Sequence, residues 1–134
     1  MIWGNAQVSD NVEIFDNVEV CGNAEVYGNA QLRDRACVDC DAQVYGDSQI
    51  YGISRITDYA EVYDYAKVYD NADIYDNAKI YGKAKVYESA CVFDDAEIYD
   101  HAKICGNAKI CGNARVYGNV KVHNKTIINH GRYE

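Results

Sequence analysis

Proline is absent from this sequence of 134 residues, and no stretch of it stays apolar for long. Without proline, and with 49% apolar residues, the chain is neither collagen-like nor a disordered polyelectrolyte. A membrane-spanning helix needs about 20 consecutive apolar residues, and no run approaches that length. The start, residues 1–5, has neither a basic nor an apolar segment, so we expect a soluble, cytoplasmic chain without a signal peptide.

Basic residues are outnumbered, with 13 Lys and Arg against 21 Asp and Glu and a net charge of −8. Because a phosphate backbone is bound by clustered Lys and Arg, we expect no direct nucleic-acid binding and no membrane binding. The charge is also uneven: residues 1–66 hold 12 acids and 3 bases, and residues 67–134 hold 9 acids and 10 bases. This acidic N-terminal half favours a basic partner.

A period of six residues runs through the chain. A branched aliphatic residue stands at every sixth position from Ile2 to Ile128, and a small or modest β-branched residue precedes it by two positions. A period of six does not fit a helix, whereas a pair at i and i+2 lies on one side of a strand. Recurrent Gly-Asn and Asp-Asn pairs suit tight corners. Each hexad is therefore predicted to be a short strand plus a corner, stacked into a solenoid.

This hexad pattern resembles the hexapeptide repeat of the bacterial transferases over residues 1–130. The resemblance implies that three hexads form one triangular coil, wound as a left-handed parallel β-helix. We expect an all-β fold with one domain at residues 1–130, about seven coils, no inserted loops, and a short C-terminal tail at residues 131–134. The left hand comes from the family alone, since crossover connections in general are right-handed.

Tyrosines stack in columns when the sequence is folded at three hexads per coil. Ten of the 13 tyrosines directly follow the core aliphatic residue, so we expect them to point outward. Such ladders either stabilise the sheets by stacking or form an oligomer or ligand interface, and the two roles are compatible. The predicted binding tyrosines are Tyr27, Tyr45, Tyr63, Tyr81, Tyr99 and Tyr117 in one column, and Tyr51, Tyr69 and Tyr87 in another.

Charged residues form two further columns. A column of like charge consists of Lys67, Lys85, Lys103 and Lys121. It is either a solvated face or a site for an anion or acidic partner. An acidic corner consists of Asp58, Asp76 and Asp94, with Asp41 adjoining. Stacked carboxylates suit calcium, but Asp is also an ordinary corner residue, so we predict no metal site and keep these acids as candidate protein-binding residues.

We predict that the six cysteines do not form a disulfide framework. Cys21 and Cys111 share a column five coils apart, and Cys37 and Cys91 share one three coils apart, which exceeds the roughly 7 Å Cα separation that a disulfide spans. Cys37 and Cys40 have CxxC spacing, but no second pair accompanies them, so zinc is not expected. Free thiols fit a cytoplasmic protein.

Histidine is scarce, and this limits the catalytic hypotheses. The family resemblance implies an acyltransferase with a histidine general base at a trimer interface, and the candidate here is His101, which occupies a corner. The chain lacks the inserted loop and the C-terminal helix that are common in that family. The three histidines of a γ-class carbonic anhydrase site are not matched by His101, His123 and His130. No cofactor is predicted.

Three functions remain open. The first is a non-catalytic scaffold or protein-interaction module that uses the tyrosine ladders, the acidic half and uncapped ends, with a protein partner or with self-association as a trimer through a face or end to end. The second is an acyltransferase-like enzyme that acts as a trimer with His101 as base. The third is an acidic decoy that occupies a basic, nucleic-acid-binding surface of a partner protein. The missing catalytic parts favour the first.

Overall fold

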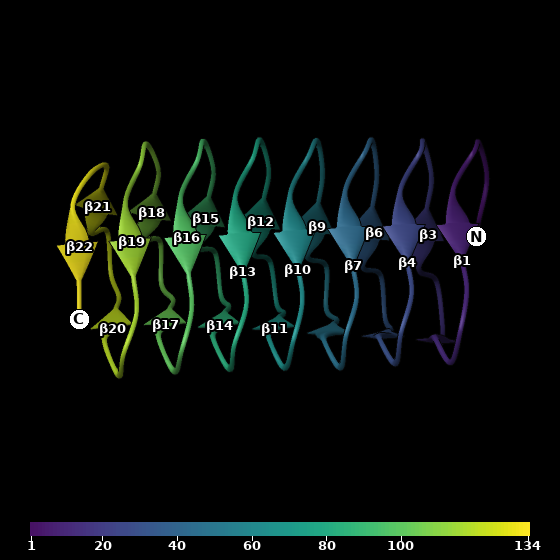
Figure 1. Ribbon diagram of the computed structural model, residues 1–134, viewed down its shortest axis with the longest axis horizontal. Helices are drawn as coiled ribbons and strands as arrows, with labels where there is room; N and C mark the ends of the chain where they lie inside the picture. The colour runs from purple at the N-terminus through teal and green to yellow at the C-terminus, as the bar shows by residue number, and fades with distance from the viewer.

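The computed structural model describes residues 1–134 as an all-β solenoid without helices. Twenty-two strands of two residues each form three parallel sheets that run along the three faces of the rod (Figure 1). No element of the structure meets the length and apolarity that a membrane-crossing helix requires. The predicted fold, a parallel β-helix of about seven coils with three hexads in each and no inserted loops, is confirmed.

We name two of the three sheets after their outward side chains and call the remaining one the third sheet. The tyrosine sheet consists of β1 (Gln7–Val8), β4 (Glu25–Val26), β7 (Gln43–Val44), β10 (Glu61–Val62), β13 (Lys79–Ile80), β16 (Glu97–Ile98), β19 (Arg115–Val116) and β22 (Arg132–Tyr133). The lysine sheet consists of β2 (Glu13–Ile14), β5 (Gln31–Leu32), β8 (Gln49–Ile50), β11 (Lys67–Val68), β14 (Lys85–Val86), β17 (Lys103–Ile104) and β20 (Lys121–Val122). The third sheet consists of β3 (Glu19–Val20), β6 (Cys37–Val38), β9 (Arg55–Ile56), β12 (Asp73–Ile74), β15 (Cys91–Val92), β18 (Lys109–Ile110) and β21 (Ile127–Ile128).

The winding of the chain is left-handed. In Figure 1 the strands of the tyrosine sheet run down the near face, the chain returns up the far face, and successive coils advance from right to left. Neighbouring strands pair at a register of three hexads, as in Glu61 with Lys79. The last pair differs, because Arg115 lies opposite Arg132, one residue short of that register. The segment expected as a tail therefore adds a strand, β22, to the tyrosine sheet.

The corners depend on residues with positive φ. Ten glycines, nine of them at the repeat's corner position, and twelve other residues, mainly aspartate, adopt this conformation. Each aspartate with positive φ turns its carboxylate along the rod, where it accepts a hydrogen bond from the backbone N–H one coil further. Asp34 accepts from Gly52 at 2.9 Å, and Asp94 accepts from Gly112 at 2.9 Å. Aspartate thus tolerates the left-handed conformation and satisfies an amide of the next coil.

The interior of the rod is a continuous column of alanine and branched aliphatic side chains. A cluster of 34 buried residues runs along its axis, and most of them have no exposed surface. Two serines interrupt the column, Ser48 and Ser54, and both are fully buried. The Ser54 hydroxyl donates a hydrogen bond to the Tyr51 carbonyl at 2.8 Å, whereas the Ser48 hydroxyl has no partner.

Because only the Ser54 hydroxyl has a hydrogen-bond partner, replacement of Ser48 and of Ser54 by alanine should affect stability differently. A buried hydroxyl without a partner costs about 1–3 kcal/mol, so Ser48→Ala should raise the free energy of unfolding by about 1 kcal/mol. Ser54→Ala removes a satisfied hydroxyl and should leave stability unchanged or lower it by up to about 1 kcal/mol. Urea denaturation followed by circular dichroism measures both. A stabilisation at Ser54 that equals or exceeds that at Ser48 would contradict the prediction.

Candidate functional site

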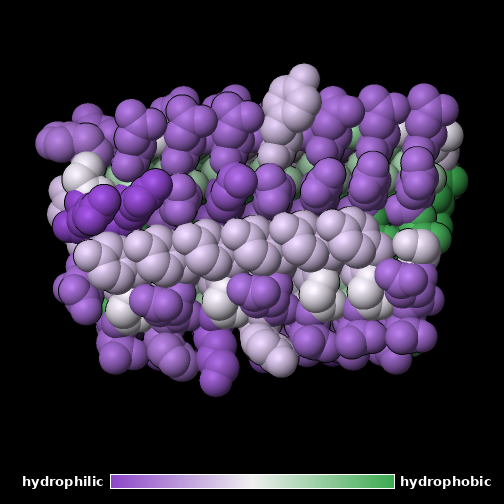
Figure 2. Space-filling view, viewed as in Figure 1, coloured by the Kyte–Doolittle hydropathy of each residue, from purple (hydrophilic) through white to green (hydrophobic).

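The largest aromatic feature of the surface is the tyrosine ladder of the tyrosine sheet. Its six rings stack with centroids 4.8–5.0 Å apart and interplanar angles of 1–6°. Figure 2 shows them as an unbroken pale strip along the rod, with polar side chains on both sides. The predicted column Tyr27, Tyr45, Tyr63, Tyr81, Tyr99 and Tyr117 is therefore present, and each ring is half-buried against its neighbours.

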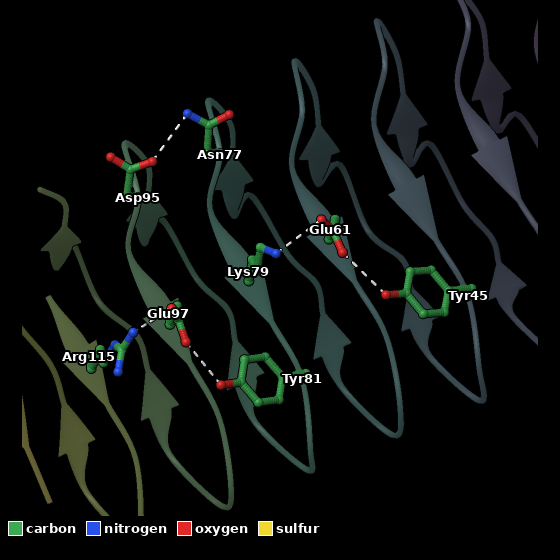
Figure 3. Close-up of polar contacts among 8 residues, drawn as sticks. All are labelled: Tyr45, Glu61, Asn77, Lys79, Tyr81, Asp95, Glu97 and Arg115. Carbon is green, nitrogen blue, oxygen red and sulfur yellow. Dashed lines mark hydrogen bonds and ion pairs between the residues drawn. The ribbon is translucent and has the colours of Figure 1, made fainter. Parts of the chain in front are cut away.

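Carboxylates beside the ladder hold two of its phenols. The Tyr45 hydroxyl donates to Glu61 Oε2 at 3.2 Å, and Glu61 also pairs with Lys79 at 3.3 Å. The same pattern recurs two coils along, where the Tyr81 hydroxyl donates to Glu97 and Arg115 pairs with that carboxylate (Figure 3). Each glutamate thus links a phenol to a cation of the next coil.

Burial and these contacts raise the pKa of the central ladder phenols further above the ordinary value of a tyrosine. Burial, and secondly the Glu61 carboxylate, raise the pKa of Tyr63 to about 12. Burial likewise raises the pKa of Tyr45 and Tyr81, with a further increase from the hydrogen bonds to Glu61 and Glu97. Neutral phenols at physiological pH can donate hydrogen bonds to a partner and pack against it without desolvating a charge.

The lysine sheet has the shorter predicted ladder. Tyr51, Tyr69 and Tyr87 stack with centroids 4.8 and 4.9 Å apart, and the Arg33 guanidinium lies 4.9 Å from the centre of the Tyr51 ring. The third sheet has a stacked pair, Tyr75 and Phe93, which is not among the predicted binding residues. The signal was available, because both residues occupy the same repeat position as the other ladders.

A hollow of about 520 Å³ lies on the corner between the tyrosine and lysine sheets. We name it the lysine groove, and its lining consists of Tyr65, Lys67, Lys83, Lys85, His101, Lys103 and Asn119. One side of the groove is formed by Lys67, Lys85 and Lys103 of the lysine sheet. These three lysines lie directly above one another, because their strands pair in register. No carboxylate lines the groove.

The candidate base His101 lies in this groove rather than in a catalytic arrangement with other histidines. It is exposed, its backbone N–H donates to the Gly118 carbonyl at 2.9 Å, and its imidazole makes no hydrogen bond. A general base is normally oriented by a third group, and no carboxylate contacts this imidazole. His123 and His130 do not line the groove. The role of His101 as a base stays a prediction.

Carboxylates of the acidic corner accept hydrogen bonds from backbone amides of the next coil. Asp58 accepts from the Asp76 amide at 3.4 Å, and Asp76 accepts from the Asp94 amide at 3.2 Å. Asp41 accepts from the Asn23 side chain at 3.0 Å. No group of three or more His, Cys, Asp or Glu side chains is arranged to hold a metal ion. The aspartates thus have a structural role, and their part in binding stays a prediction.

All six cysteines are free thiols. Cys21 and Cys105 are buried, and the other four are half-buried. Burial and the neighbouring Asp39 raise the pKa of the Cys21 thiol to about 12, which keeps it protonated. A protonated, buried thiol is a poor nucleophile and a poor metal ligand, so Cys21 behaves as a small apolar side chain.

A comparison with models of protein families matches a short segment of the chain. A search of curated proteins and of solved structures gives no match to the chain. The likeness to the hexapeptide-repeat transferases therefore rests on the repeat pattern alone. One family model does match, over residues 108–124, which lie near the C-terminal end of the rod and include β18, β19 and β20. Over those residues the chain is similar to the family described as the YdcK beta solenoid repeat.

Proposed function

We propose that this solenoid is a non-catalytic scaffold that pairs with a second copy of itself through the tyrosine sheet. The observation that supports the proposal is the unbroken ladder of six stacked, half-buried phenols that no other part of the chain covers. Tyrosine is enriched at protein interfaces because it combines apolar area with a hydrogen-bonding group. The rings are already ordered by stacking, so association immobilises few additional side chains.

The straightness of the ladder favours a face-to-face antiparallel pair. Successive rings deviate by only 1–6°, so the strip does not twist away from a flat partner. Such a pair is related by a two-fold axis that lies in the interface, perpendicular to the long axes of the rods. The axis makes the two rods antiparallel, and each column of side chains then faces the equivalent column of the other copy. Tyr63 of one copy then faces Tyr81 of the second copy, and Tyr27 faces Tyr117.

Beside the ladder runs a charged column that consists of Glu25, Gln43, Glu61, Lys79, Glu97 and Arg115. Its charges match this arrangement at two of the three facing pairs. With the same axis, Glu25 of one copy faces Arg115 of the second copy, and Glu61 faces Lys79. On a larger scale, residues 1–66 have a net charge of −9 and residues 67–134 have a net charge of +1. An antiparallel pair places each acidic half against the nearly neutral half of the other copy, whereas a parallel pair brings the two acidic halves together.

Light scattering over a concentration series tests the proposal. The chain has a mass of 15.0 kDa, so the expected particle is a dimer of about 30 kDa. Glu25→Arg and Arg115→Glu should each weaken the dimer about tenfold, or about 1.4 kcal/mol, because each places like charges face to face. The two substitutions in one chain should restore the dimer, because positions 25 and 115 of the facing copies again carry opposite charges.

The matched control is Glu19→Arg, which makes the same change of charge on the third sheet. It should leave the dimer intact. Replacing Tyr63 and Tyr81 together by serine should abolish the dimer, with circular dichroism as the check that the solenoid remains folded. A monomer at every concentration, a trimer, or a mass that grows without limit would contradict the proposal. So would a double charge exchange that fails to restore pairing.

A further inference from the structure

The lysine column has no counter-charges of its own. The molecule has two ion pairs, Lys79 with Glu61 and Arg115 with Glu97, and both lie on the tyrosine sheet. None of Lys67, Lys83, Lys85 or Lys103 has a carboxylate within ion-pair distance. Like charges on adjacent rungs repel one another, so this arrangement destabilises the empty sheet. It is also unexpected in a chain with a net charge of −8.

The nearest acidic corner does not offset this charge. Its carboxylates, Asp64 and Asp100, accept hydrogen bonds from the Gly82 and Gly118 amides at 3.1 and 3.2 Å. They are turned along the corner, and neither lines the groove. The groove is therefore lined by four ammonium groups and one imidazole, together with a phenol and an amide.

We infer that the lysine groove is a binding site for a short oligophosphate. Lysine binds phosphate oxygens as a point charge on a flexible stem, and several lysines in a row engage several phosphates of one chain. Adjacent strands lie about 4.8 Å apart, so the column from Lys67 to Lys121 spans about 14 Å. Lys83, on the corner, adds a charge on the opposite side of the groove.

The charge around the groove favours a short ligand over a nucleic acid. Towards the N-terminus the same column continues as Gln49, Gln31 and Glu13, so the positive charge ends at Lys67. A long polyanion that followed the column would leave the lysines and run along the acidic half, where it would be repelled. A ligand that fits within the four lysine rungs avoids this repulsion. The site is distinct from the tyrosine sheet and does not depend on dimerisation.

Titration calorimetry with sodium tripolyphosphate on the full chain tests the inference. We expect saturable binding that weakens as salt is added, and at least tenfold weaker binding of inorganic orthophosphate, because one phosphate engages fewer lysines. Lys85→Gln combined with Lys103→Gln should weaken tripolyphosphate binding at least tenfold. The matched control, Lys109→Gln combined with Lys125→Gln, removes the same charge from a hollow on another corner and should change the affinity less than twofold.

Thermal denaturation separates loss of the site from loss of the fold. Without ligand, the groove variant should melt at or above the wild-type temperature, because two repelling charges are gone. The inference is overturned if tripolyphosphate does not bind, or if the control variant loses as much affinity as the groove variant. It is also overturned if a twelve-nucleotide single strand binds through the same lysines more tightly than tripolyphosphate.

Discussion

Replacing Ile80 by aspartate is expected to leave no cooperatively folded solenoid. Its side chain is fully buried on β13, near the middle of the rod, with β10 on one side and β16 on the other. The substitution removes apolar burial of about 1.5–3 kcal/mol and introduces a buried charge without a partner, which costs several kcal/mol more. The total is comparable with the about 5–15 kcal/mol that stabilises a typical domain.

The solenoid architecture makes this site more sensitive than one at an end of the rod. Each coil contacts only the coils above and below it, so a disrupted central coil separates two short stacks. The expected result is loss of the β-sheet signal in circular dichroism and loss of a cooperative urea transition. Ile80→Val keeps the shape of the core and should cost only about 0.5–1.5 kcal/mol.

The matched control adds the same carboxylate at a solvated position. Asn107 is exposed on a corner, where its column neighbours are Ser89 and Lys125. Asn107→Asp should change the free energy of unfolding by less than about 0.5 kcal/mol. A variant with Asp at position 80 that melts cooperatively near the wild-type temperature would show that the core tolerates a charge and would contradict the packing account.

The strands and coils were predictable because the repeat leaves little freedom. Every aliphatic residue of the period that lies in a strand ends that strand, from Val8 in β1 to Ile128 in β21. A slip by one residue would turn each aliphatic side chain outward, so burial fixes the register. The exception is the last strand, where Gly131 falls outside the hexad pattern and the register shortens by one residue.

Contacts between coils were less predictable, because they depend on how side chains turn along the rod. The corner aspartates were expected as turn residues, but their bonds to the amides of the next coil follow from the positive φ that directs each carboxylate along the axis. The bond from Tyr45 to Glu61 joins two different columns on neighbouring coils. Likewise, Ser48 and Ser54 are equivalent in the repeat but differ in their hydrogen bonds.

The candidate sites also differ in whether they follow from the repeat or depend on the positions of individual side chains. The tyrosine columns were predicted residue by residue, because outward direction follows from the period alone. His101 was predicted as a base from a family likeness, and the structure places it among lysines without an orienting carboxylate. The hollow that joins Lys83 and His101 to the lysine column depends on side-chain positions at the corner. A shared fold does not transfer a reaction, so the function of this chain depends on the side chains that these surfaces present.

The second large effect is expected at high pH, where the solenoid should unfold as its tyrosines ionise. Burial raises the pKa of Tyr63 and of Tyr69 to about 12, against about 10 for a free phenol. Below pH 10 these two phenols are neutral in both the folded and the unfolded state, and their full contribution to stability is present. Above pH 10 the unfolded chain loses phenolic protons first, so stability falls as the pH rises towards 12. Tyr45, Tyr81 and Tyr87 have pKa values shifted in the same direction and add to the loss.

Absorbance at 295 nm and circular dichroism, recorded on the same samples from pH 9 to 12.5, measure this coupling. The part of the phenolate band that comes from Tyr63 and Tyr69, which is the difference between the wild type and the variant without these two phenols, should rise together with the loss of sheet signal, above the pH at which the urea-unfolded chain titrates. Tyr63→Phe combined with Tyr69→Phe removes two ionising groups that make no side-chain hydrogen bond, and Phe93 already stacks on Tyr75 at 4.9 Å in the same position. This variant should have the same stability as the wild type at pH 7 and should unfold at a higher pH than the wild type. If Tyr63 and Tyr69 titrated near pH 10 while the sheet signal persisted, the prediction would be contradicted, because the ladder would then offer these phenols no protection from water.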